Sequence, residues 1–171
     1  MMMTKQQLIR FLQTFGDYQK DFNRLAQKIC GTNCVNYYFF EISVHCDDEE
    51  ALPLAQILGC SVEELSDGFT HNDVCWKNCG GDMGISTLNP EEDKALVGLV
   101  EQNYLDLKSQ SSDFRWSYAP DVKSGTGLLF LYTKATKAEV LTILPAEPFD
   151  WTEDSCSFLF EDLQVAICFE Q

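Results

Sequence analysis

Apolar residues that recur in steps of three and four predict a long helix at the start of the chain. Thr4 is a helix-capping residue, and Gln7 three positions later completes the pattern of a capping box. Gly31 supplies the usual glycine stop at the other end. The helix is expected to bury one stripe of side chains, namely Leu8, Phe11, Leu12, Phe15, Tyr18, Phe22, Leu25 and Ile29.

The segment after this helix changes from helical to β periodicity. Residues 36–44 are aromatic and β-branched, which predicts a strand. The acidic run 47–50 favours a helix start, because negative charge meets the positive end of the helix dipole. Pro53 is expected in the first turn of that helix, where its missing N–H has no cost.

Two further helical segments are expected before residue 83. Ser61 and Glu64 form a second capping-box pattern. We interpret residues 71–82, "HNDVCWKNCGGD", as the end of a helix. Trp76 is expected to pack inward and Gly80 to stop the helix.

The second half of the chain begins with a helix and continues with strands. Asn89 and Pro90 are typical of a cap and a first helical turn, and the helix is expected to reach about residue 108. From residue 113 the aromatic residues alternate with polar ones, which predicts strands. Residues 138–144 fit a strand or a short helix, and Thr136 as a cap favours the helix. The tail is expected to form two strands that turn at Glu161-Asp162.

These elements predict an α+β fold, in which a helical N-terminal half packs on a mainly antiparallel sheet from the C-terminal half. Residues 1–108 are the mainly helical part, with one strand near 36–44, and residues 113–171 are the β-rich part. We expect one compact domain or two tightly packed lobes. No internal sequence repeat is visible.

The charge of the chain is high and uneven. The formal net charge is −15, of which residues 1–46 contribute +2 and the remaining 125 residues contribute −17. No Lys or Arg follows Lys137. Such a field repels nucleic acid and attracts basic protein surfaces. The apolar runs are too short to span a membrane and no secretory signal is visible, so we expect a cytoplasmic protein without a membrane partner.

The cysteines and histidines offer one candidate metal site. In a reducing compartment, cysteines are more often buried thiols or metal ligands than disulfides. On a helix, residues spaced four apart share one face, and four such donors suit tetrahedral zinc. We expect no cofactor, and the alternative is a zinc site drawn from Cys30, Cys34, His71, Cys75 and Cys79.

Residues 51–68 resemble the last two helices of the helix-turn-helix domains of Cro-type phage repressors. The matching positions are Leu54, Ala55, Leu58, Gly59, Ser61 and Leu65. The resemblance implies a tight pair of helices. It carries over no DNA-contacting residue, because a strand-like segment occupies the place of the family's DNA-reading helix.

The whole profile is similar to that of small acidic inhibitors from phages and other mobile elements, the anti-CRISPR proteins among them. This resemblance implies a non-enzymatic protein that binds a basic nucleic-acid-binding host protein, such as a CRISPR effector nuclease, and blocks its nucleic-acid groove. The contacts are expected from one continuous acidic surface and from exposed aromatic residues. The candidate acids are Asp47, Asp48, Glu49, Glu50, Glu91, Glu92, Asp93, Glu153, Asp154, Glu161 and Asp162, and the candidate aromatics are Trp116, Phe149 and Trp151.

Two other functions stay open. A DNA-binding regulator is favoured by residues 51–68 and by the basic residues of the first helix, which also leave direct contact with nucleic acid open. A cysteine-dependent enzyme needs a base beside its thiol, and the nearest pairs in sequence are His71 with Cys75 and His45 with Cys46.

Overall fold

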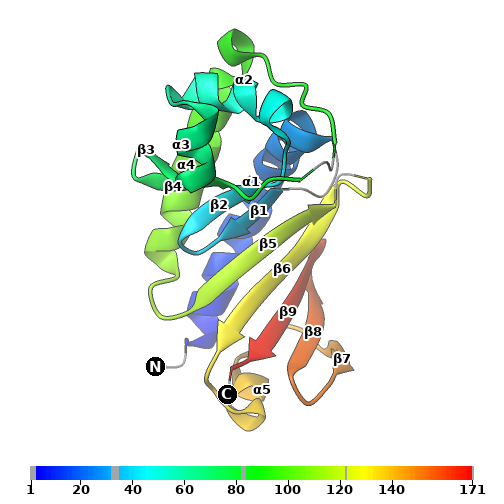
Figure 1. Cartoon of the computed structure of the whole chain (residues 1–171). Coiled ribbons are helices and arrows are strands. Elements are labelled where there is room, and N and C mark those ends of the chain that lie inside the picture. The colour runs from blue at the N-terminus through cyan, green and yellow to red at the C-terminus, as the bar shows by residue number, and fades with distance from the viewer. Residues whose placement is uncertain (1–2, 32–34, 82–83, 122, 171) are drawn as a thin grey trace.

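The computed structural model describes residues 3–31, 35–81, 84–121 and 123–170, and its fold is α+β, as the sequence predicted (Figure 1). The helices are α1 (Lys5–Cys30), α2 (Asp48–Leu58), α3 (Val62–Asp67), α4 (Pro90–Gln110) and α5 (Lys137–Ile143). The strands are β1 (Val35–Tyr38), β2 (Glu41–Val44), β3 (Phe69–His71), β4 (Val74–Asn78), β5 (Arg115–Asp121), β6 (Thr126–Thr133), β7 (Pro148–Trp151), β8 (Ser155–Phe160) and β9 (Leu163–Phe169).

The described strands form one sheet in the order β3-β4-β2-β1-β5-β6-β9-β8-β7. Neighbours are antiparallel except for two parallel pairs, β2 with β4 and β6 with β9. Each parallel pair is joined through helices, α2 and α3 in the first case and α5 in the second. A parallel pair requires such a crossover, because a tight turn reverses the direction of the chain.

The topology contains an internal two-fold pattern that the sequence does not display. Each half of the chain begins with a long helix and a hairpin, continues with a helical crossover, and ends on a strand parallel to the second hairpin strand. Strand order places β3-β4-β2-β1 opposite β8-β9-β6-β5, with the antiparallel β1–β5 pair at the centre. β7 is the exception, because the first half has no described strand beyond β3.

One row of side chains crosses the whole sheet on the face toward the helices. The register pairs join Phe69, Trp76, Ile42, Tyr37, Tyr118, Leu129, Val165, Phe158 and Pro148 in that order. The seven residues between the two ends of this row are fully buried. Phe22 of α1 packs at the centre, with its ring 4.6 Å from that of Tyr37. The core of both halves is therefore one continuous layer.

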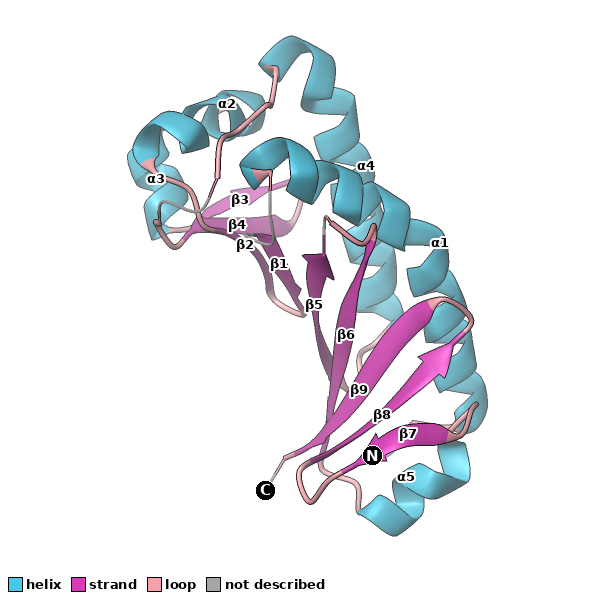
Figure 2. Cartoon of the chain, turned by 90° about the vertical axis from the view of Figure 1, so that its right-hand side faces the viewer, coloured by secondary structure: helices cyan, strands magenta, loops and turns pink. Residues whose placement is uncertain are grey.

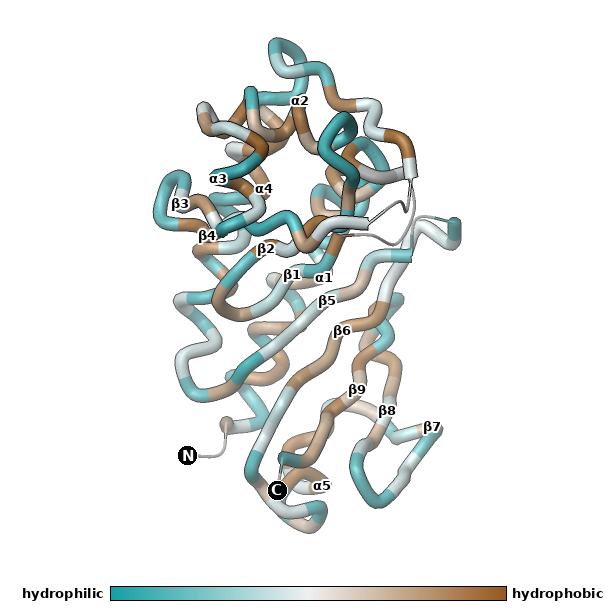
Figure 3. The backbone as a smooth tube through the Cα atoms, viewed as in Figure 1, coloured by the Kyte–Doolittle hydropathy of each residue, from teal (hydrophilic) through white to brown (hydrophobic). Residues whose placement is uncertain are grey.

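Long helices cover only this face of the sheet. Figure 2 shows α1 and α4 along one side, and none of the described helices crosses the opposite side of β1, β5, β6 and β9. The predicted stripe of α1 is confirmed, since all its members are buried except Tyr18, which is half-buried. Strands β6 and β9 are largely hydrophobic along their length (Figure 3). Because only alternate residues of a strand face the helices, the other apolar residues lie on the uncovered side.

The local signals for helix starts are confirmed. Thr4 and Ser61 form capping boxes with the residues three positions later, and Asn89 caps α4 ahead of Pro90. Thr136 likewise caps a helix, α5, which resolves the ambiguous segment. Two strands also meet at Glu161-Asp162, as predicted.

The predicted single strand at 36–44 is wrong, because the segment is a hairpin of β1 and β2. Tyr37 pairs with Ile42, and the chain turns at Phe39 and Phe40. No glycine, proline or asparagine marks this turn. The Phe39 N–H donates to the Trp116 carbonyl at 2.9 Å, so a distant strand helps to hold it.

The predicted helix end at 71–82 is also wrong, because β3 and β4 form a second hairpin there. Its turn residues, Asn72 and Asp73, have φ angles of 47° and 66°. Asn and Asp tolerate this left-handed conformation, which suits a two-residue hairpin turn. Pro53 is likewise misplaced by the prediction, since α2 begins at Asp48 and Pro53 lies beyond its first turn.

The expected division at residues 108–113 does not separate the sheet. The part up to residue 108 contributes four strands instead of one, and β1 of that part pairs directly with β5 of the other. Both parts therefore share one sheet and one core.

Candidate binding surfaces

The first candidate surface is the pair of helices α2 and α3 with their caps, residues 47–67, which we call the acidic hairpin. The tight helix pair that the repressor-like segment implied is present here. The hairpin holds seven acids, and no Lys or Arg occurs between Lys28 and Lys77. All of the acids are exposed except Glu50, which is half-buried: Asp47, Asp48, Glu49, Glu50, Glu63, Glu64 and Asp67.

Capping chemistry explains why acids gather in the hairpin. Asp47 accepts from the Glu50 N–H at 2.8 Å, and the Glu50 carboxylate accepts from the Asp47 N–H at 3.2 Å. Ser61 and Glu64 repeat this arrangement at α3. The acids that take no part in these caps extend into solvent, so the same local preference that starts the helices also creates a negative surface.

A second group of acids lies at the other end of the sheet. Figure 1 shows the acidic hairpin at the top and the β7–β8 turn at the bottom. Strands are about 4.8 Å apart, so the eight intervals from β3 to β7 span roughly 38 Å along the sheet before twist. The predicted acids 47–50 and those of 153–162 thus lie in two separate groups instead of on one continuous surface. The second group consists of six exposed acids, four beside or in β7 (Glu147, Asp150, Glu153 and Asp154) and two at the other end of β8 (Glu161 and Asp162).

Asp93 is not available to a partner, although Glu91 and Glu92 beside it are exposed. Its carboxylate is buried, accepts from the Asn89 N–H at 2.6 Å and lies 3.0 Å from the Lys28 ammonium. Burial alone raises the pKa of Asp93, but this hydrogen bond and the Lys28 charge outweigh it and lower the pKa below its ordinary value. Asp93 therefore joins α1 to α4, and the prediction of a surface role is wrong for this residue.

The uncovered side of the sheet carries a third surface, which we call the open face. Tyr38, Ser117, Phe130 and Ala166 follow one another in register across β1, β5, β6 and β9. Aromatic rings thus stand on either side of small residues. We define the open face by its uncharged residues, Tyr38, Ser117, Leu128, Phe130, Tyr132, Leu159, Ala166 and Cys168. Two charged residues, Glu41 of β2 and Arg115 of β5, lie on the same side of the sheet. Apolar surface of this kind is typical of an interaction site.

One edge of the open face is held by a charged side chain. The Arg115 guanidinium carbon lies 5.5 Å from the centre of the Tyr132 ring, and the same group is paired with Glu170. The Ser117 and Tyr132 hydroxyls lie 3.1 Å apart. These contacts fix the orientation of the Tyr132 ring.

The three predicted aromatic residues differ in how exposed they are. Trp116 is only 1% exposed and packs among Phe15, Tyr104 and other core rings, so its predicted surface role is wrong. Phe149 is 58% exposed, whereas Trp151 is half-buried with the Lys137 ammonium 5.9 Å from its ring centre. The sequence could not show which aromatic residues are exposed, because alternation identifies the two faces of a strand but not which of them is covered.

The His71 side chain pairs with a buried carboxylate. Glu101 of α4 has a side chain that is 2% exposed, and its Oε1 lies 2.7 Å from His71 Nδ1. The same oxygen accepts from Trp76 Nε1 at 2.8 Å, and Oε2 accepts from Asn72 Nδ2 at 3.0 Å. Glu101 was not a candidate from the sequence, because only the tertiary structure brings α4 beside the β3–β4 hairpin.

The structure separates His71 from Cys75. His71 pairs with Val74, and Cys75 pairs with Thr70, so the two side chains leave the hairpin on opposite faces. Cys79 is exposed beyond β4. The Cys30 side chain and Cys34 lie outside the described residues. Across residues 3–31, 35–81, 84–121 and 123–170, no group of three or more His, Cys, Asp or Glu side chains is arranged to hold a metal ion.

Cys46, Cys75 and Cys156 do not have the environment of a nucleophile. Burial and the Glu41 carboxylate raise the pKa of Cys75, and burial raises the pKa of Cys156 to about 11. Cys46 is 1% exposed and out of reach of a substrate. A reactive cysteine needs a lowered pKa and access to solvent.

Comparison of the chain with protein-family models, curated proteins and solved structures gives no match. None of the helices in the described part of the chain combines the length and the apolar character that crossing a membrane requires.

The sequence did contain a signal for the open face. Residues 127–133 are apolar at almost every position, so both faces of β6 carry large side chains. A strand with one solvated face normally alternates apolar and polar residues. β6 is antiparallel to β5 and parallel to β9, and its loss of alternation places large apolar side chains on both of its faces.

Proposed function

We propose that this chain is a non-enzymatic inhibitor that binds a basic nucleic-acid-binding protein and blocks its nucleic-acid groove, in the manner of the anti-CRISPR class. It acts in the cytoplasm of the host cell, and its partner is an RNA-guided nuclease. The observation that carries the proposal is the acidic hairpin, in which exposed carboxylates are grouped in a stretch of sequence that contains no Lys or Arg. A grooved basic surface attracts such a group as it attracts phosphates.

The open face supplies the second requirement of a protein-binding surface. Charge speeds and orients association, whereas apolar and aromatic contacts provide most of the affinity. Tyr38 of β1 and Phe130 and Tyr132 of β6 offer such contacts on the two sides of β5. An acidic end and an aromatic face together fit a protein partner better than a small molecule.

The same geometry disfavours the DNA-binding regulator. The shorter helix of the pair, α3, exposes Glu63, Glu64 and Asp67, and these carboxylates repel the phosphates that a DNA-binding helix must approach. The α1 lysine nearest to that end, Lys28, is paired with Asp93. A gel-retardation assay with duplex DNA is expected to show no shift at physiological salt.

The test is inhibition of DNA cleavage by a panel of purified RNA-guided nucleases. The triple variant Glu49→Gln, Glu63→Gln, Asp67→Asn removes three charges from the acidic hairpin and leaves both capping boxes intact. We expect it to raise the concentration for half-inhibition about tenfold, which corresponds to about 1.4 kcal/mol.

A matched control removes the same charge elsewhere. The variant Asp113→Asn, Glu161→Gln, Asp162→Asn changes three exposed acids outside the hairpin. It is expected to inhibit like the parent chain. Inhibition should also weaken as salt is raised, because the Debye length is about 8 Å at physiological salt. Equal loss in both variants, or no inhibition of any nuclease in the panel, contradicts the proposal.

A further inference from the structure

β7 is the edge strand of the sheet at the end opposite the acidic hairpin. It pairs with β8 on one side only, and the pairing shifts register between Pro148 and Asp150. In an antiparallel ladder, alternate residues direct their N–H and C=O groups away from the neighbour. β7 therefore presents backbone groups that an extended segment from another chain can pair with.

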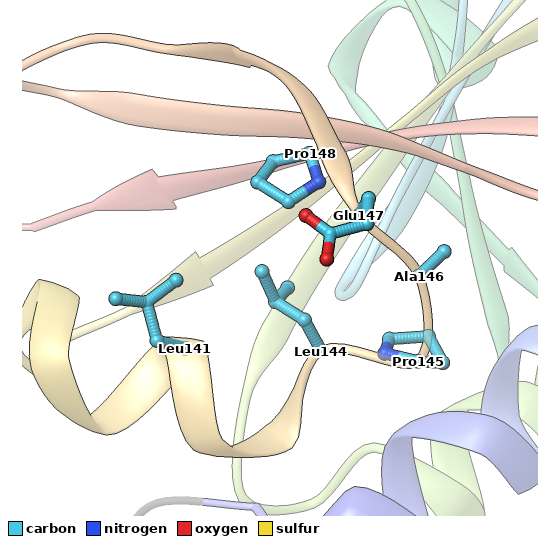
Figure 4. A pocket seen from close by; sticks show the side chains of 6 residues that line it. All are labelled: Leu141, Leu144, Pro145, Ala146, Glu147 and Pro148. Atoms are coloured by element: carbon cyan, nitrogen blue, oxygen red, sulfur yellow. The ribbon is translucent and has the colours of Figure 1, made fainter.

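A pocket adjoins this edge where α5 leads into β7. Its volume is about 390 Å³, and the side chains of its lining residues are apolar except for that of Glu147: Leu141, Leu144, Pro145, Ala146, Glu147 and Pro148. Figure 4 shows the Glu147 carboxylate directed toward the space between Leu144 and Pro148. Leu141 and Phe149, on the two sides of the connection, are 55% and 58% exposed.

This combination fits the side chain of a lysine or an arginine. Such a side chain buries an apolar stem and keeps a cationic head at its tip. The leucine and proline side chains of the pocket suit the stem, and Glu147 is placed to pair with the head. A purely apolar side chain would leave the Glu147 carboxylate without a partner and partly desolvated.

The acidic residues around the β7 edge also favour a basic segment. Glu147, Asp150, Glu153 and Asp154 are all exposed, and they outnumber Lys137, whose ammonium lies 5.9 Å from the ring centre of Trp151 in β7. A second copy of the chain would bring the same acids against each other, which disfavours edge-to-edge pairing of two copies. A basic segment meets complementary charge instead.

We propose that the β7 edge and its pocket bind an extended basic segment of a protein partner, which adds a strand beside β7 and places one Lys or Arg side chain against Glu147. The inference rests on the proposed function, because it gives the same basic partner a second contact with this chain. It is separate in location, because the acidic hairpin lies at the far end of the sheet.

The experiment uses the full chain and an immobilised library of degenerate ten-residue peptides. We expect the parent chain to enrich Lys or Arg at one fixed position, with β-branched residues on either side. Glu147→Gln, an isosteric change, should bind the selected peptide about tenfold more weakly. N-methylation of alternate backbone nitrogens of that peptide should abolish binding, because strand addition needs those N–H groups. The matched control, Glu91→Gln, changes an exposed acid at the start of α4 and should bind like the parent.

The possible outcomes separate this inference from the proposed function. No enrichment of Lys or Arg, equal binding by Glu147→Gln, or full binding of the N-methylated peptide overturns the inference. A dimer in sedimentation experiments that the peptide dissociates also overturns it, because the edge then serves a second copy. If a nuclease is inhibited equally by the parent and by Glu147→Gln, the inference fails and the proposed function stands. If no nuclease is inhibited while Glu147-dependent peptide binding is found, the inference stands and the proposed function fails.

Discussion

Replacing Glu101 with alanine removes the one acceptor that three side chains of the β3–β4 hairpin share. The bonds from His71, Trp76 and Asn72 measure 2.7, 2.8 and 3.0 Å, and the Glu101 side chain is 2% exposed. A buried donor that loses its acceptor costs the free energy of its desolvation, whereas an exposed donor turns to water. The effect of the substitution therefore depends on which donors remain buried.

The three donors differ in this respect. Trp76 is fully buried, the His71 side chain is 28% exposed, and Asn72 is exposed. Only the Trp76 N–H stays sealed from solvent, at a cost of about 1–3 kcal/mol, and the lost charge-assisted bonds add to it. We expect Glu101→Ala to lower the free energy of unfolding by about 3 kcal/mol, a large part of the roughly 5–15 kcal/mol of a typical domain.

Glu101→Gln is the informative companion, because its amide oxygen can still accept from Trp76. Its amide nitrogen meets the Asn72 amide, which is exposed and free to reorient. The expected loss is about 1 kcal/mol. Gln102→Ala, an exposed neighbour on the same helix, serves as the control and should leave the free energy of unfolding almost unchanged.

Urea denaturation followed by circular dichroism measures all three variants. Hydrogen exchange of the β4 amides adds a local measurement, because the loss should appear first in the β3–β4 hairpin. A loss below about 1 kcal/mol for Glu101→Ala would refute the reasoning, since a buried Trp76 N–H without an acceptor cannot be that inexpensive.

Three further predictions test other parts of the structure. Gly127→Ala places a Cβ 2.6 Å from the Ala119 carbonyl oxygen and against the Tyr118 hydroxyl, so thermal melting should show a loss of about 3 kcal/mol or failure to fold. Asp93 has a lowered pKa in the folded protein. Its ionised form therefore stabilises the fold above its unfolded pKa, and this stabilisation is lost as the pH falls through its folded pKa. Asp93→Asn should reduce the loss of unfolding free energy between pH 7 and pH 3. Iodoacetamide at neutral pH should label exposed Cys79 at least roughly tenfold faster than Cys156, whose pKa burial raises to about 11; equal rates would contradict this burial.

The sequence by itself determined the features that depend on neighbours within about four residues. The caps at Thr4, Ser61 and Asn89 and the stripe along α1 are read correctly, because a helix start and a helical face are each set by residues one turn apart. The acidic character of α2 and α3 follows from the same local rule, since carboxylates stabilise helix starts.

Only the tertiary structure decided which strands pair, which face of the sheet is covered and where the charges end up. The turn at Phe39 has no local signal and is held by a bond to Trp116, far away in the chain. The Asn72-Asp73 turn did have a signal, but the short runs around it also fit a helix end until Glu101 is brought beside them. Strand pairing joins residues whose separation in sequence carries no information about register, so the open face, the two acidic groups and the β7 edge emerge only when the sheet is assembled.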